Sequence, residues 1–168
     1  MIRGGKGGSK TQTGIRFEER INLSLAISKI NGYSVAGNYI IKGERKIAEI
    51  FTKNKLYKNL LEPLEIDYLK YISKKLLPDE AILIDKTLYI IEMKFQYVAG
   101  SVDEKLQTCD FKKKQYDKLF SDTDIKVEYV YVLNDWFKKA EYKDVLQYIK
   151  YVGCHYFFNE IPLSKLGL

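Results

Sequence analysis

The chain has 168 residues and a formal net charge of +6. This length suits one domain with a substantial core, so we expect a single domain over residues 1–168. The positive charge favours a polyanionic partner. No apolar run is long enough to span a membrane and no signal peptide follows Met1, so we expect a soluble, cytoplasmic protein with no membrane partner. One histidine and two cysteines exclude metal sites built on several such ligands.

Residues 1–13 contain four glycines together with Arg3, Lys6 and Lys10. A segment with this composition cannot bury enough apolar surface to fold alone, so we predict a flexible, basic, glycine-rich arm. Lys6 and Lys10 are candidates for contacts with DNA phosphates. A disordered tail without a binding role is the alternative.

Apolar residues follow a helical repeat over residues 15–30, which predicts a first helix. Glu18 lies on the same side of this helix as Ile21 and Leu25, so its carboxylate partly faces the core. Glu19 is flanked by apolar residues almost as well. A solvated helix acid is the alternative for either residue.

Residues 33–41 alternate weakly and include Gly37, so they predict a first strand or an irregular edge. Residues 46–61 and 66–76 carry apolar side chains at near-helical spacing, and Pro63 separates them. They predict a helical insertion that could carry target contacts or a dimer surface. A purely structural helical pair fits the same pattern.

Two apolar, β-branched-rich runs follow, at residues 81–84 and 88–91, and polar residues separate them. This is the pattern of a β-hairpin. If Asp85 and Lys86 are the two central turn residues, the last residue of the first strand pairs with the first of the second. A three-residue turn would shift this register by one and send every side chain of one strand to the other face.

The two-residue turn brings Asp79 directly opposite Glu92, and strand alternation puts Glu92 and Lys94 on one face. Like charges opposed across a ladder repel each other, so we expect a cation between them. Mg²⁺ is the natural candidate because it is held by one or two carboxylates with waters and phosphate oxygens. Lys94 would complete a hydrolytic site.

The succession Pro78-Asp79, an apolar strand and Glu92-Met93-Lys94 resembles the signature of the PD-(D/E)xK nuclease superfamily, particularly its type II restriction endonucleases. This resemblance implies that Asp79, Glu92 and Lys94 are catalytic and that Asp79 and Glu92 bind Mg²⁺. Residues 14–18 resemble the first helix of many members, which implies Glu18 as a further metal ligand. A structural hairpin with a chance salt bridge is the alternative.

The stretch after Lys94 supplies further candidates for DNA contacts. Gln96 keeps the face of Glu92 if the strand continues, and Ser101 lies where Gly100-Ser101 ends it. Residues 102–120 predict one lysine-rich helix, in which Lys105 and Gln107 lie nearest the hairpin. The remaining lysines of this helix are also available for DNA, although such runs usually form a solvated face: Lys112, Lys113, Lys114 and Lys118.

The last third of the chain predicts a strand at 127–133 covered on both faces, a helix at 142–151 and a strand at 155–158. The order of these elements indicates an α/β fold with a mixed central β-sheet flanked by helices. It is also the order that the resemblance implies, a restriction-endonuclease-like core with a helical insertion before the catalytic hairpin.

These observations predict a Mg²⁺-dependent, sequence-specific endodeoxyribonuclease that hydrolyses phosphodiester bonds of double-stranded DNA. A type II restriction enzyme acting as a homodimer is the leading interpretation, since twofold symmetry matches palindromic sites. A Holliday-junction or repair nuclease of the same superfamily is one alternative. A DNA-binding module without catalysis is the other.

Overall fold

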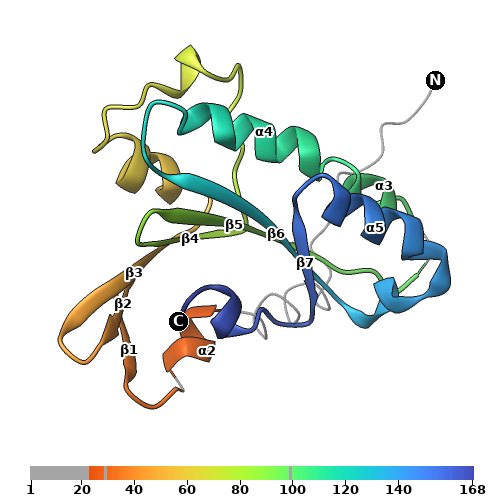
Figure 1. Cartoon of the computed structure of the whole chain (residues 1–168), viewed down its shortest axis with the longest axis horizontal. Coiled ribbons are helices and arrows are strands. Elements are labelled where there is room, and N and C mark those ends of the chain that lie inside the picture. The colour runs from red at the N-terminus through yellow and green to blue at the C-terminus, as the bar shows by residue number, and fades with distance from the viewer. Residues whose placement is uncertain (1–22, 29, 99) are drawn as a thin grey trace, which may run out of the picture.

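The structure is a computed structural model that describes residues 23–28, 30–98 and 100–168 (Figure 1). The described part of the predicted first helix is α2 (Leu23–Ser28), in which Ile27 is fully buried. Glu18, Glu19 and the basic arm with Lys6 and Lys10 lie outside the described residues.

One seven-stranded sheet forms the centre of the described chain, and its strands neighbour one another in sequence order. The first five strands pair antiparallel, whereas β5, β6 and β7 are parallel. The predicted α/β fold with a mixed sheet is thus confirmed. The strands are β1 (Tyr33–Ala36), β2 (Tyr39–Lys42), β3 (Arg45–Phe51), β4 (Glu80–Ile84), β5 (Thr87–Lys94), β6 (Lys126–Leu133) and β7 (His155–Phe158).

Helices cover both faces of this sheet (Figure 1). On one face lie α3 (Val102–Leu106), α4 (Cys109–Leu119) and α5 (Lys143–Tyr151), which form the crossovers between the parallel strands. The other face carries α2 and the C-terminal residues. Short helical turns complete the described chain: Tyr57–Leu61, Tyr68–Lys70, Asp135–Lys138, Ala140–Tyr142 and Leu163–Lys165.

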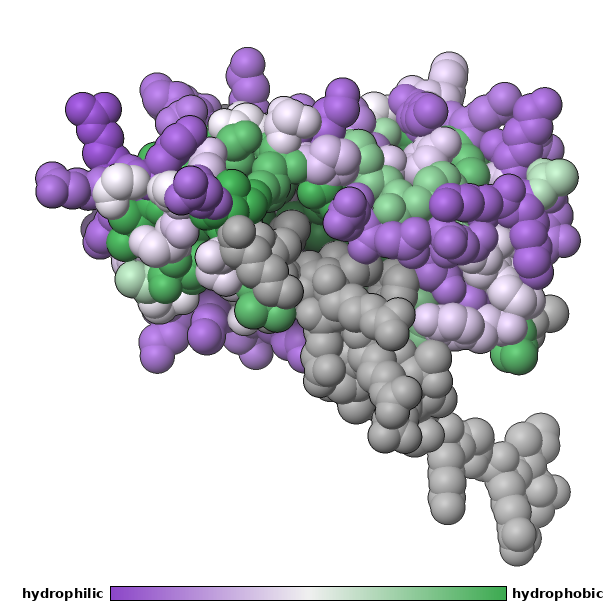
Figure 2. Space-filling view, turned by 90° about the horizontal axis from the view of Figure 1, so that it is seen from below, coloured by the Kyte–Doolittle hydropathy of each residue, from purple (hydrophilic) through white to green (hydrophobic). Residues whose placement is uncertain are grey.

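The buried side chains form two clusters, one on each face of the sheet. The α4-side cluster includes Leu88, Ile90 and Tyr129, together with residues of α4 and α5. The α2-side cluster includes Ile91 and Val130 and is closed by α2 and the C-terminal residues. Figure 2 shows the molecule from below, with apolar residues gathered between hydrophilic ones. Residues of β6 contribute to both clusters, which confirms the prediction that this strand is covered on both faces.

The predicted helix at 46–61 is wrong over its first half, which is strand β3. Ile50 and Phe51 pair across the sheet with Ile82 and Ala81. These long-range contacts override the local helical spacing. Only the second half of the segment is helical, and it ends in a π-helical turn at Tyr57–Leu61.

Three further boundaries differ from the predictions. Residues 33–41 form two short strands rather than one, because Gly37 turns the chain with a positive φ of 62°. The predicted helix at 66–76 is reduced to a 3-10 turn at Tyr68–Lys70. The predicted helix at 102–120 is divided into α3 and α4 at residues 107–108.

Candidate functional site

The hairpin of β4 and β5 has the predicted register. Ile84 pairs with Thr87 across the turn at Asp85 and Lys86, and the ladder continues to the pair Glu80–Ile91. Asp85 adopts a positive φ of 50°, a conformation that aspartate tolerates better than most residues. One residue beyond the last pair, Asp79 therefore lies opposite Glu92.

The approach of the chain to Asp79 is fixed by two buried tyrosines. The hydroxyl groups of Tyr57 and Tyr116 donate hydrogen bonds to the Leu76 carbonyl at 3.0 and 3.1 Å. The Leu76 N–H donates to the Tyr57 hydroxyl at 2.9 Å. Burial raises the pKa of Tyr57 to about 12, so its hydroxyl stays protonated at neutral pH. The segment before the hairpin thus has a structural role close to the site.

Asp79 itself is held through backbone groups on both sides. The Lys53 N–H donates to the carbonyl of the buried Pro78 at 3.0 Å, which ties the end of β3 to the start of β4. The Met93 N–H donates to Asp79 Oδ2 at 2.8 Å. These bonds place the Asp79 carboxylate beside the end of β5, at the same end of the sheet as Glu92.

Lys94 lies between the two carboxylates. Its Nζ is 2.7 Å from Glu92 Oε2 and 3.8 Å from Asp79 Oδ2, and it also donates to the Met93 carbonyl at 3.2 Å. The Glu92 side chain is only 8% exposed, whereas that of Asp79 is 29% exposed. The structure therefore brings together the three residues predicted from the sequence, with one ammonium group shared between two carboxylates.

Mg²⁺ fits this arrangement by the chemistry of the donors. Asp79 and Glu92 both pair with the Lys94 ammonium, so the two carboxylates lie close enough to share one cation. Among the described residues, no group of three or more His, Cys, Asp and Glu side chains forms a metal cluster. Two carboxylates are nevertheless enough for Mg²⁺ when waters and substrate phosphate oxygens complete its shell. The Asp79 side chain is 29% exposed, so solvent can reach its carboxylate.

A second lysine reaches the site from α4, and the sequence analysis did not assign it there. Lys112 Nζ is 3.5 Å from Glu92 Oε1, so the two oxygens of Glu92 face two different ammonium groups. Helix spacing alone does not single out Lys112. Lys112 and Lys113 both lie three or four positions from Cys109 and Tyr116, which are fully buried.

Three fully buried tyrosines lie near Glu92. Tyr129 makes ring contacts with Tyr116 and Tyr131, with centroids 6.5 and 5.4 Å apart. Burial, with the Glu92 charge adding to it, raises the pKa of Tyr116 and Tyr129 far above the ordinary value. These hydroxyl groups therefore stay neutral and contribute no charge to the site.

The loop after Lys94 is fixed by Gln96 and Asn134. The Gln96 N–H donates to Asn134 Oδ1 at 3.2 Å, and Asn134 Nδ2 donates to the Gln96 carbonyl at 2.8 Å. Gln96 Nε2 donates to the Gly100 carbonyl at 3.3 Å. Strand β5 ends at Lys94, and the Gln96 side chain is buried. Its amide thus closes a loop, whereas the sequence analysis placed it toward a phosphate.

The candidates for DNA contacts in and beside α3 are exposed. Ser101 lies in the turn before α3, Lys105 is in its last turn, and Gln107 follows it. The Lys105 carbonyl accepts a hydrogen bond from the Tyr131 hydroxyl at 3.2 Å, which links α3 to the sheet. The roles of these side chains toward DNA stay predictions.

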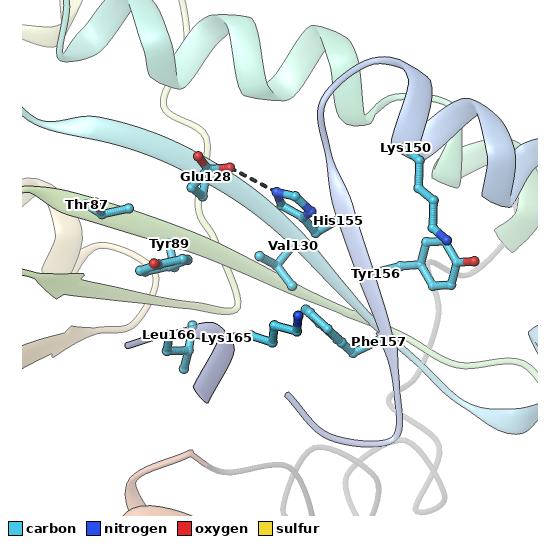
Figure 3. A pocket seen from close by; sticks show the side chains of 10 residues that line it. All are labelled: Thr87, Tyr89, Glu128, Val130, Lys150, His155, Tyr156, Phe157, Lys165 and Leu166. Atoms are coloured by element: carbon cyan, nitrogen blue, oxygen red, sulfur yellow. Dashed lines mark hydrogen bonds and ion pairs between the residues drawn. The ribbon is translucent and has the colours of Figure 1, made fainter. Parts of the chain in front are cut away.

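A separate pocket of about 520 Å³ lies on the opposite face of the sheet, where β5 and β6 begin (Figure 3). In this pocket His155 Nε2 is 3.2 Å from Glu128 Oε2, and the Lys165 side chain lines it from the C-terminal residues. Asp79, Glu92 and Lys94 do not line this pocket. The one carboxylate in its described lining, that of Glu128, is already paired with the His155 imidazole, and no second acid lies there to share a cation with it.

Comparison of the chain with models of protein families, with curated proteins and with solved structures finds no match. None of the helices in the described part of the chain is long and apolar enough to cross a membrane.

Proposed function

We propose that the protein is a Mg²⁺-dependent endodeoxyribonuclease that hydrolyses phosphodiester bonds in double-stranded DNA. Within this class we propose a sequence-specific type II restriction enzyme. The observation that carries this proposal is the convergence of Asp79 and Glu92 on Lys94 at adjoining strand ends. The succession of hairpin, helix and parallel strand supports a restriction-endonuclease-like core.

In this proposal each residue has a distinct role. Asp79 and Glu92 hold the cation, and Glu18 from the first helix is proposed as a further ligand. Bound Mg²⁺ supplies positive charge to the scissile phosphate and makes a water easier to deprotonate. Lys94 orients the attacking water or neutralises charge that develops on the phosphate. The water oxygen bonds to phosphorus and gives up a proton to solvent, one ester P–O bond breaks, and the leaving oxygen takes up a proton from solvent.

The partner in this proposal is double-stranded DNA. The net charge of +6 favours a polyanion, and Lys6, Lys10 and Lys105 are proposed to contact its phosphates. Ser101 and Gln107 are the proposed polar contacts, and Gln96 holds the loop that precedes them. A homodimer would present two sites to the two strands of a palindrome.

Incubation with plasmid DNA tests the proposal. The expected result is a set of discrete fragments with Mg²⁺ and intact DNA with EDTA, and Glu92→Gln should remove the cleavage. Smeared products would favour a nonspecific repair nuclease, and resolution of a synthetic four-way junction would favour a junction nuclease. Intact plasmid with a mobility shift at every Mg²⁺ concentration would overturn catalysis and leave a DNA-binding module.

A further inference from the structure

The two oxygens of Glu92 are paired with lysines from two different elements. Lys94 comes from the same strand and contacts Oε2 at 2.7 Å, whereas Lys112 comes from α4 and lies 3.5 Å from Oε1. The Glu92 side chain is only 8% exposed. A divalent cation that binds Glu92 therefore competes with ammonium groups that already neutralise it.

The two lysines are held unequally. Lys94 contacts both carboxylates and the Met93 carbonyl, and its side chain is 18% exposed. Lys112 makes one long ion pair within the site, and its side chain is 27% exposed. An ammonium group on a flexible four-carbon stem moves readily when its only ion pair is lost. When a cation binds Glu92, we therefore expect Lys112 to leave the carboxylate before Lys94 does.

We propose that Lys112 exchanges partners during the reaction, leaving Glu92 Oε1 when the cation binds and moving to a phosphate oxygen of the DNA strand being cut. This inference rests on the proposed nuclease function. It makes Lys112 a second positive group at the scissile phosphate, beside Lys94. Before the cation binds, the ion pair with Lys112 keeps a buried carboxylate neutralised, since an unpaired buried charge is costly.

If Lys112 exchanges partners, replacing it with a neutral residue should tighten Mg²⁺ binding and slow cleavage. Lys112→Met removes the competitor for Glu92, so Mg²⁺ should bind the DNA-free protein about fivefold more tightly, as loss of a partly exposed ion pair allows. The same variant lacks the phosphate contact, so single-turnover cleavage at saturating Mg²⁺ should fall about 100-fold. A residue that only stabilised the fold would weaken both.

Calorimetric titration with Mg²⁺ and single-turnover cleavage of a short duplex measure the two effects. Lys138→Met is the matched control, because Lys138 also pairs with an acid, Asp135 at 2.8 Å, and its side chain is 52% exposed. It should change neither measurement. Lys112→Arg keeps the charge and should retain most of the cleavage. Lys112→Gln replaces Lys112→Met if urea unfolding shows that the methionine variant does not fold.

Unchanged or weaker Mg²⁺ binding in the neutral Lys112 variants would overturn the exchange. Tighter Mg²⁺ binding with unchanged cleavage would overturn the contact with phosphate. If the unmodified protein cuts no DNA, the proposed nuclease function fails. The Mg²⁺ titration would still decide whether Lys112 competes for Glu92, so the two failures are distinguishable.

Discussion

Replacing Asp79 with asparagine separates the charge of the candidate site from its shape. Asp79 Oδ2 accepts a hydrogen bond from the Met93 N–H at 2.8 Å, and the oxygen of asparagine can accept the same bond. The substitution removes a negative charge that lies 3.8 Å from Lys94 Nζ. We expect the hairpin to persist and the cation site to be lost.

The expected change in stability follows from exposure. The side chains of Asp79 and Lys94 are 29% and 18% exposed, so losing this solvent-screened pair costs at most about 1 kcal/mol in the free energy of unfolding. Asp79→Ala also leaves the Met93 N–H without its acceptor, which adds about 0.5–1.5 kcal/mol. Cleavage should fall at least about 100-fold in both variants, because each loses a charged ligand of the proposed cation.

Urea unfolding in EDTA measures the stability of both variants, and calorimetric titration measures their affinity for Mg²⁺. Single-turnover cleavage of a short duplex gives the rate. Cleavage by Asp79→Asn within tenfold of the unmodified protein would refute the role of the Asp79 charge. Equal destabilisation by asparagine and alanine would instead refute the argument that the Met93 hydrogen bond holds this side chain.

Three further predictions concern Tyr116, Glu49 and the start of the chain. Tyr116→Phe should lower the free energy of unfolding by about 1 kcal/mol and slow cleavage, because the Leu76 carbonyl loses a donor near Asp79; urea unfolding and cleavage rates check this. Burial raises the pKa of Glu49, so its contribution to stability is present below the ordinary carboxyl pKa and is lost as pH rises. Glu49→Gln should therefore be the more stable protein at neutral pH and equal to the unmodified one in acid, as thermal unfolding across pH would show. Deleting residues 1–10 should weaken DNA binding and flatten its salt dependence, by about 0.9 log unit per lost phosphate contact, in anisotropy titrations.

The hairpin could be predicted because its signals are local. Two apolar, β-branched-rich runs, the polar pair Asp85-Lys86 and the acids at 79 and 92 all lie within one short stretch, and the observed register follows from them. The parallel strands at the C-terminal end were also predicted well. The continuous apolar run of β6 reflects burial on both faces, which is a property of the strand itself.

Strand β3 could not be predicted because its signals are not local. Ile47, Ile50 and Phe51 suit a helix as well as a strand, and pairing with β4 decides between the two. Lys112 was missed for a related reason. Three consecutive lysines look alike in sequence, and only the packing of α4 against the sheet directs the first of them to Glu92.

The number of residues in the β4–β5 turn decides which acids lie opposite each other, and this links the sequence to the proposed chemistry. Two central turn residues leave Asp79 in phase with Ala81, whose side chain belongs to the α4-side cluster, and opposite Glu92. Glu80 pairs with Ile91 and lies on the other face of the sheet, that of the α2-side cluster. A turn with one more residue would move Asp79 to that face and Glu80 to the α4-side face. Glu92 would then lie beside Lys112 and Lys94 without Asp79. The pairing of the acids therefore depends on the conformation of Asp85 and Lys86, two exposed residues at the opposite end of the hairpin from the site.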